Sequence, residues 1–279
     1  MTLGVAALVL FAALLHAAWN ALIKASGDAV RDTAAVAAGA GLVAALLLPW
    51  VAAPAPAGLP YLLASCVLHQ AYFALVAAAY RSGDLSFAYP LMRGVAPLLV
   101  ALASLAVLPH TPSPGLWLGI AAISAGVLWI GGVRVRSLRS HARAASFALG
   151  NAVVIAAYTL VDGLGVRAAG DPVSYGLWLF FLMAWPYLGV VLWTRRKRLV
   201  LPARTLLARA FIGGSASVAA YLIVLWAMTH APIAAVAALR ETSVIFAALI
   251  GAWLLKEPLG RHRLAGACLV VLGIALLRA

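Results

Sequence analysis

The chain has 279 residues, of which 66% are hydrophobic and only 10% are charged, and its mean hydropathy is +1.06. Soluble domains are roughly half apolar and a quarter charged, so this composition excludes an ordinary soluble domain and indicates an integral membrane protein. The net charge of +13 would suggest nucleic-acid binding in a soluble protein, but here the cations lie in loops between apolar stretches. We therefore expect a lipid bilayer as a partner and no nucleic acid.

An α-helix needs about 20 mostly apolar residues to cross a bilayer. Ten stretches meet this requirement, and their apolar residues are continuous rather than alternating, which favours helices over barrel strands. Because backbone groups in lipid must be satisfied internally, we predict an all-α integral membrane protein. The predicted spans are 3–24, 33–53, 59–80, 86–108, 115–133, 144–168, 173–194, 207–229, 233–255 and 261–278.

Two stretches of the chain resemble each other without a gap. GDLSFAYPLMRGVAPLLVAL, which opens residues 83–130, falls on HAPIAAVAALRETSVIFAAL, which opens residues 230–277, at a shift of 147 residues. Each copy holds five spans, and an odd number makes the second copy enter the membrane from the opposite side. We predict two inverted five-helix repeats, 1–141 and 142–279, an arrangement common in transporters. The shift pairs Arg93 with Arg240, Gly119 with Gly266 and Gly126 with Gly273.

The distribution of lysine and arginine predicts the orientation. Sixteen of the 20 lie in odd-numbered loops, two lie on the other side, and two lie within spans. The positive-inside rule therefore places the basic loops in the cytoplasm and both termini outside. The first span has no basic region before it, so we expect it to be retained rather than cleaved as a signal.

Four ionisable residues lie within predicted spans, and their formal charges sum to zero: Arg93, Asp162, Arg240 and Glu241. An unpaired charge at mid-bilayer costs at least ~2.5–3.5 kcal/mol, so we expect these groups to pair. They are either static salt bridges between helices or groups that line a transport path and exchange partners. In the inverted arrangement we expect Arg93 near the cytoplasmic mouth, Arg240 near the outer mouth and Asp162 level with Arg240.

The first span carries a polar stripe, because His16, Asn20 and Lys24 are spaced four residues apart and Trp19 adjoins them. These residues either line a cavity or make interhelical hydrogen bonds, with Lys24 reaching the interface. Aromatic and histidine side chains in other spans serve packing or ligand contact equally well. The full predicted cavity set is His16, Trp19, Asn20, Lys24, His69, Tyr72, Tyr89, Arg93, Tyr158, Asp162, Tyr221, Arg240 and Glu241.

The chemistry expected of an enzyme is missing from the sequence. Cys66 and Cys268 are isolated in apolar runs and are predicted to pack rather than react. No HExxH, GxSxG or clustered acidic motif occurs, and the six histidines are scattered. We therefore expect no enzymatic activity, no metal and no cofactor, and an intramembrane lipid-modifying enzyme is the alternative from another class.

At these residues the sequence resembles the EamA-type branch of the drug/metabolite transporter superfamily. GDLSFAYPLMRGVAPLLVAL with GIAAISAGV resembles the first copy of the family, and APIAAVAALRETSVIFAALIGAWLLKEPLGRHRLAGACLVVLGIAL resembles the second. The resemblance implies ten helices, a central cavity lined mainly by spans one, three, four, six, eight and nine, and transport of small metabolites. One departure is Val244, where the family usually has proline, and cytoplasmic termini are usual in such proteins.

Arginines bind carboxylates and phosphates bidentately, and Asp162 and Glu241 would accept an ammonium group. We therefore predict a secondary transporter of the bacterial cytoplasmic (inner) membrane that exports an amino-acid-like zwitterion, a small-molecule substrate. The alternative in the same class is a carrier of an organic-acid or phosphorylated anion. Proton coupling through Asp162, Glu241 or His16 stays open, and no oligomeric state is predicted.

Overall fold

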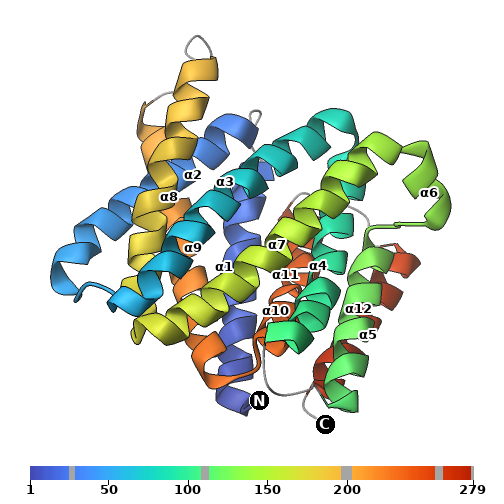
Figure 1. The fold of residues 1–279 in the computed structure, drawn as a ribbon. Coiled ribbons are helices and arrows are strands. Elements are labelled where there is room, and N and C mark those ends of the chain that lie inside the picture. Colours follow the sequence, from blue (N-terminus) through green and yellow to red (C-terminus); the bar gives the residue numbers. More distant parts are fainter. Residues whose placement is uncertain (25–28, 108–112, 196–202, 255–259, 278–279) are drawn as a thin grey trace.

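The computed structural model describes residues 1–24, 29–107, 113–195, 203–254 and 260–277, which fold into helices without a strand in these ranges (Figure 1). The helices are α1 (Leu3–Lys24), α2 (Ala29–Leu47), η1 (Leu48–Trp50), η2 (Pro56–Gly58), α3 (Leu59–Ser82), α4 (Leu85–Val107), α5 (Pro114–Ile130), α6 (Val135–Ser140), α7 (Ala142–Ala169), α8 (Pro172–Arg195), α9 (Ala203–His230), α10 (Ile233–Arg240), α11 (Ser243–Leu254) and α12 (Arg261–Leu276).

The prediction of an all-helical membrane protein is confirmed. Within the described residues, eight helical segments are long and apolar enough to cross a membrane. Each of the ten predicted stretches overlaps a helix in the described residues, but α5 has 17 residues and α12 has 16, which is short of a full span. α6 was not predicted, because it forms within the basic link between the two halves.

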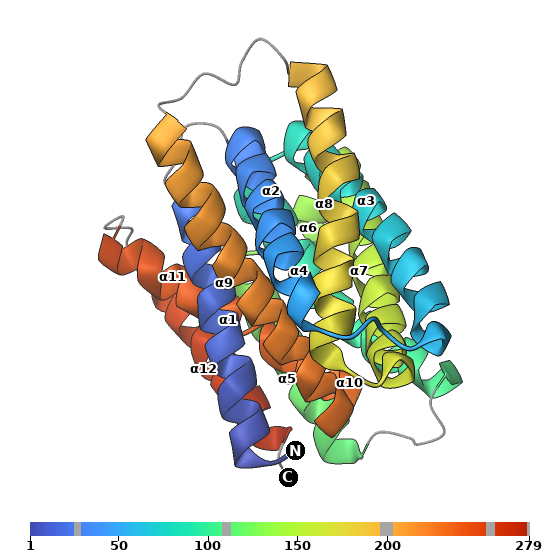
Figure 2. The same cartoon turned by 90° about the vertical axis from the view of Figure 1, so that its left-hand side faces the viewer.

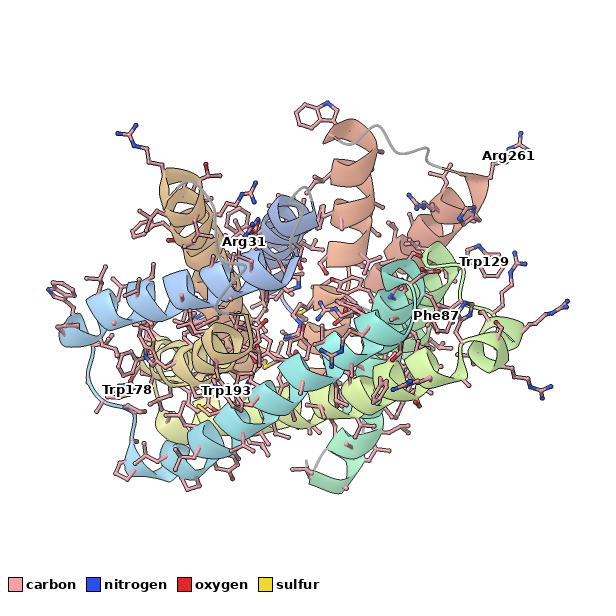
Figure 3. The ribbon with its side chains drawn as sticks, turned by 90° about the horizontal axis from the view of Figure 1, so that it is seen from above. Arg31, Phe87, Trp129, Trp178, Trp193 and Arg261 are labelled. Atoms are coloured by element: carbon pink, nitrogen blue, oxygen red, sulfur yellow. The ribbon has the colours of Figure 1, made fainter. Side chains whose placement is uncertain are left out.

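Large apolar side chains cover the outside of the bundle. Trp50, Trp193 and Trp253 are 79%, 79% and 84% exposed, and each lies close to the end of its helix. Tryptophans at helix ends are typical of the two membrane–water interfaces. In the view from above, Trp129 and Arg261 lie at the outer edge of the bundle, on α5 and α12 (Figure 3). This surface is suited to lipid rather than to water.

The two halves of the chain are interleaved rather than placed side by side. α3 packs on α7 and α1 packs on α9, so that the first and third helices of each half meet the other half. Likewise α4 packs on α7 and α1 packs on α11, while α2 lies against both α8 and α9. Both termini lie at one end of the bundle, and α8 ends and α9 begins at the opposite end (Figures 1 and 2).

α5 and α12 pack closely because glycines face the partner helix at the contact. A Cβ atom on Gly119 would lie 2.9 Å from the carbonyl oxygen of Gly273, and one on Gly126 would lie 2.7 Å from that of Gly266. The contacts are reciprocal: at a shift of 147 residues, Gly119 corresponds to Gly266 and Gly126 to Gly273. Gly119 contacts Gly273, and their equivalents in the other half, Gly266 and Gly126, contact each other in the same way. A twofold axis produces paired contacts of this kind.

We expect Gly126→Ala and Gly273→Ala each to destabilise the protein by about 1–3 kcal/mol, because the added methyl group overpacks a contact with backbone. The new Cβ would lie 2.7 Å from a carbonyl oxygen in the first case and 2.8 Å in the second. Thermal unfolding of the purified protein in detergent measures the effect. Gly150→Ala in α7 is the control, since nothing lies within 4 Å of that Cβ, and an equal loss there would contradict the explanation.

The ninth predicted span is interrupted in the middle. α10 ends at Arg240, α11 begins at Ser243, and Glu241 and Thr242 form a turn between them. The amide of Glu241 donates to the carbonyl of Ala238 (3.0 Å), a tighter i to i−3 pattern than in an α-helix. At the equivalent place in the first half, α4 is continuous although it contains Pro90 and Pro97.

Candidate functional site

The break between α10 and α11 places a carboxylate between two arginines in the core of the bundle. Nε of Arg93 lies 2.6 Å from Oε2 of Glu241, and Nε of Arg240 lies 3.9 Å from Oε1 of the same residue. Arg93 is 3% exposed, Arg240 is 5% exposed and Glu241 is 1% exposed, so all three charges are buried. We call these residues the ion triad. It carries a formal net charge of +1.

The expectation that Arg93 and Arg240 lie at opposite mouths is wrong, because both contact one carboxylate. The reason is the depth that each residue reaches. Arg93 is the ninth residue of α4 and Arg240 the eighth of α10, so each lies roughly 10–12 Å along its helix. Half of a hydrocarbon core is about 15 Å, so a residue at that depth lies nearer the middle of a span than its mouth.

The hydrogen bonding of the triad is incomplete on both arginines. Nη2 of Arg93 donates to Oγ of Ser243 at 3.5 Å, and its guanidinium carbon lies 6.0 Å from the centre of the Tyr89 ring, within cation–π range. Nε of Arg240, Nε of Arg93 and Oε2 of Glu241 each lack a hydrogen bond of good geometry among the described residues, although their charges are paired. A buried guanidinium N–H without a partner is a favourable place for an incoming anionic group.

Asp162 forms a second polar cluster, held by α7. One carboxylate oxygen accepts a hydrogen bond from the Tyr175 hydroxyl of α8 at 2.9 Å, and the other accepts one from the Tyr221 hydroxyl of α9. Asp162 is fully buried, and within the described ranges no cationic side chain forms an ion pair with it. Among the described residues, the two neutral phenols are thus the hydrogen-bond partners of this buried carboxylate.

Aromatic rings connect the Asp162 cluster to α3. His69 packs on Tyr158 with the ring centres 4.3 Å apart and meets the edge of Tyr221 at 6.3 Å. Tyr158 also meets the ring of Tyr72 at 5.9 Å. His69 keeps one ring nitrogen 2.9 Å from the carbonyl of Ser65, one turn earlier in its own helix. The predicted residues on α3, α7 and α9 thus lie together.

The polar stripe of α1 is described as far as Asn20. His16 meets Trp19 edge-on at 5.2 Å, and the side-chain amide of Asn20 donates to the carbonyl of His16 at 2.7 Å. The hydrogen bond of Asn20 is therefore made within its own helix rather than between helices. The side chain of Lys24 lies outside the part of the chain that the structure describes, so its predicted role is not addressed.

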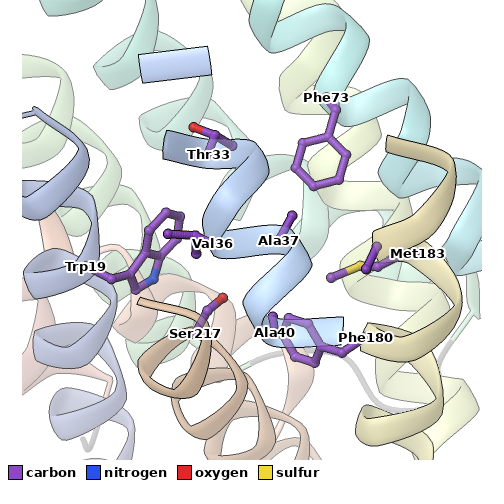
Figure 4. Close-up of a pocket in the computed structure, with 10 residues that line it drawn as sticks. Trp19, Thr33, Val36, Ala37, Ala40, Phe73, Phe180, Met183 and Ser217 are labelled. Carbon is purple, nitrogen blue, oxygen red and sulfur yellow. The ribbon is translucent and has the colours of Figure 1, made fainter. Parts of the chain in front are cut away.

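A small cavity lies beside the polar stripe of α1. Its volume is about 60 Å³, and it lies between α1, α2, α3, α8 and α9, with Trp19 from the predicted set in its wall (Figure 4). Ligand pockets usually measure ~300–1,000 Å³, so this cavity has room for only part of a solute. Among the described residues, no group of three or more histidines, cysteines or carboxylates is arranged to hold a metal.

Sequence reasoning missed several polar contacts that the fold creates. Tyr175 lies in an aromatic-rich stretch of the sequence, and no sequence feature distinguishes it from the neighbouring aromatic residues. Ser243 likewise lies in no pattern that predicts a functional contact. Asp32 is fully buried in α2 and pairs with Arg31 at 3.0 Å and with Arg209 of α9. Its position at the edge of the second predicted span was the available signal, because the chain has only seven acidic residues.

A model of the EamA-like transporter family matches residues 142–279. The chain belongs to this family, which is part of the drug/metabolite transporter superfamily. EamA members are membrane transporters, and the apolar helices of this one agree with that class. The family model covers the α10–α11 break and the Asp162 cluster. Arg93 lies outside the matched residues but contacts Glu241, which lies within them.

Solved structures share the fold of this EamA protein. One crystal structure superposes on it with a TM-score of 0.76 at 18% sequence identity, covering 99% of this chain and 96% of the other. At that identity the likeness concerns the fold alone. No curated protein sequence matches the chain.

Proposed function

We propose that this EamA protein is a secondary transporter that exports a small amino-acid-like zwitterion by alternating access. The observation that carries the proposal is the ion triad: one buried carboxylate lies between two arginines, and Nε of each arginine lacks a hydrogen bond of good geometry among the described residues. A static structural bridge needs only one cation for each carboxylate. The second guanidinium is available for a solute.

The two polar clusters have the charges that a zwitterion needs. A solute carboxylate competes with Glu241 for Arg240, because guanidinium groups bind carboxylates bidentately. The solute ammonium group binds the carboxylate of Asp162, which has only phenolic partners. Glu241 thus acts as the internal anion that holds the arginines when no solute is bound, and it stays paired with Arg93, 2.6 Å away, when a solute takes Arg240.

Inverted repeats supply the two states that alternating access requires. The reciprocal glycine contacts of α5 and α12 and the paired packing of α3 on α7 and α1 on α9 support such repeats. At equivalent positions the halves also differ, since α4 is continuous and α10–α11 is interrupted. Exchange of these two conformations between the halves would open the centre to each side in turn.

A second candidate function follows from the charge of the triad. Its net charge of +1 favours a substrate that is only anionic, such as an organic acid or a phosphorylated metabolite. Such a substrate would use the triad and leave Asp162 unoccupied. Proton coupling through Asp162 or Glu241 is compatible with either candidate.

The proposed location is the cytoplasmic membrane of a bacterial-type cell. Arg204 and Arg209, near the start of α9, lie at the end of the bundle opposite to both termini (Figure 2). The positive-inside rule places that end in the cytoplasm and the termini outside. Export then means that solute enters the centre from the basic end.

Counterflow in proteoliposomes tests the proposal. Vesicles loaded with an unlabelled α-amino acid should accumulate the labelled amino acid at least several-fold faster than empty vesicles. The matching acid without the amino group, and the matching amine without the carboxylate, should not compete. Competition by the deaminated acid as strong as that by the amino acid would support the anion carrier instead. Absence of counterflow with every amino acid would contradict the zwitterion assignment.

A further inference from the structure

The link between α5 and α7 carries four arginines within ten residues, and all four are exposed: Arg134, Arg136, Arg139 and Arg143. Within the described part of the chain, none of them forms an ion pair with a carboxylate. This includes the carboxylate of Asp84, which lies exposed just before α4. The link therefore presents four positive charges that the described residues do not neutralise.

The backbone of the link is folded. The amide of Arg134 donates to Oγ of Ser137 at 2.9 Å, and that hydroxyl donates to the carbonyl of Arg134 at 2.6 Å, which caps the start of α6. Leu138 packs on an apolar cluster that α4 and α7 share, and the ring of His141 lies 5.2 Å from that of Phe87 in α4. Positive charge that only sets the orientation in the membrane needs no such fold.

The end of α5 places the link at the depth of the lipid headgroups. Trp129 is 58% exposed and lies one residue before the end of α5. Exposed tryptophans at helix ends are typical of the membrane–water interface. In the view from above, Trp129 lies at the outer edge of the bundle (Figure 3), and α6 projects from that edge beyond the end of α5 (Figure 1). The link therefore faces the surrounding lipid.

The charge of the link is complementary to anionic phospholipid. A guanidinium group binds two phosphate oxygens at once, so arginine recognises a phosphate headgroup better than a simple point charge does. Each basic residue beside an anionic membrane contributes about fivefold in affinity. The folded backbone lowers the cost of binding, because the link need not become ordered when a lipid binds.

We propose that the four exposed arginines of the link form a docking surface for the headgroups of anionic phospholipids. We call them the arginine surface. The surface does not depend on which solute the protein carries. Because α6 is anchored on α4 and α7, a lipid that binds there holds the junction between the two halves and stabilises the folded protein.

Titration of the detergent-solubilised protein with phosphatidylglycerol or phosphatidylcholine, followed by native mass spectrometry, tests the surface. Phosphatidylglycerol has a net negative charge and phosphatidylcholine has none. We expect the parental protein to bind phosphatidylglycerol on the order of 100-fold more tightly than phosphatidylcholine. Arg136→Gln with Arg139→Gln should weaken binding of phosphatidylglycerol about 25-fold and leave that of phosphatidylcholine unchanged.

Single variants provide the matched control. Arg139→Gln should weaken binding of phosphatidylglycerol about fivefold. Arg204→Gln removes the same charge from an exposed arginine near the start of α9, on the side of the bundle away from α6 (Figure 1). It should change the affinity less than about twofold, because charges far from the site are screened.

A second double variant tests the geometry of binding. Arg136→Lys with Arg139→Lys keeps the charge but loses the bidentate contact, so its loss of affinity should lie between those of the parental protein and the glutamine variant. The substituted side chains are exposed, so thermal unfolding without added lipid should stay at the parental temperature. If the glutamine variant does not fold, the lysine variant and Arg139→Gln carry the test.

Three results would overturn the arginine surface. The first is equal affinity of the parental protein for the two lipids. The second is an equal loss in Arg139→Gln and Arg204→Gln, which would show that net charge alone attracts the lipid. The third is displacement of phosphatidylglycerol by an equal concentration of inorganic phosphate, which would make the site one for free phosphate. None of these results bears on counterflow, so the proposed function is tested separately.

Discussion

Replacing Arg93 with methionine is expected to abolish counterflow and to lower the stability of the folded protein by about 3–5 kcal/mol. The guanidinium of Arg93 is the nearer partner of the buried Glu241 carboxylate, at 2.6 Å. Its removal leaves a desolvated negative charge that Arg240, at 3.9 Å, only partly compensates. Thermal unfolding in detergent and counterflow in proteoliposomes measure the two effects separately.

Variants of the other two triad residues separate structure from transport. Arg240→Met should stop counterflow with a smaller loss of stability, because Arg240 makes the longer contact. The double variant Arg93→Met with Glu241→Gln returns the buried net charge to +1 and should recover most of the stability, but not the transport. Counterflow at the parental rate in Arg93→Met would show that the triad lies outside the transport path.

Replacing Asp162 with asparagine is expected to reduce amino-acid counterflow about 30-fold or more, because a buried charge that binds a charged substrate group contributes at least ~2 kcal/mol. Asparagine keeps the shape of the side chain and an oxygen that accepts a hydrogen bond from Tyr175 or Tyr221. The fold should therefore survive the change. Initial rates of counterflow, with thermal unfolding as the check on folding, measure the effect.

Tyr175→Phe is the matched control for Asp162→Asn. It removes the hydrogen bond of 2.9 Å but keeps the carboxylate and its charge, so the rate should fall less than about tenfold. If Asp162→Asn carries amino acids as fast as the parental protein, the ammonium group binds elsewhere. Gain of counterflow with deaminated acids in the same variant would support the assignment of Asp162 to the ammonium group.

The helices of this protein were predictable because hydropathy is local. The predicted span 3–24 coincides with α1, and the span 261–278 differs from α12 by two residues at one end. Each apolar run is bounded by proline, glycine or charge, and lipid forces the backbone within it to form a helix. The presence of Arg93, Asp162, Arg240 and Glu241 inside spans was visible for the same reason.

The partners of those charges were not predictable, because contacts between helices depend on how deep and at what angle each helix enters. Nothing in the sequence places Tyr175 on Asp162, or Asp32 on Arg209. The interruption after Arg240 was also hidden, since no proline marks it and the two prolines of the related position lie in a continuous helix. Local signals describe a helix and not the face that it presents to a neighbour.

The sequence by itself determined that this chain is a helical membrane protein, which residues lie within the membrane and that its second half has the EamA pattern. Those properties follow from composition and residue order, which act within one segment at a time. Only the tertiary structure decided that Arg93 and Arg240 share Glu241 and that two tyrosines hold Asp162. Contacts of this kind join residues as many as 177 positions apart, as in the pair of Asp32 and Arg209, and packing alone brings them together.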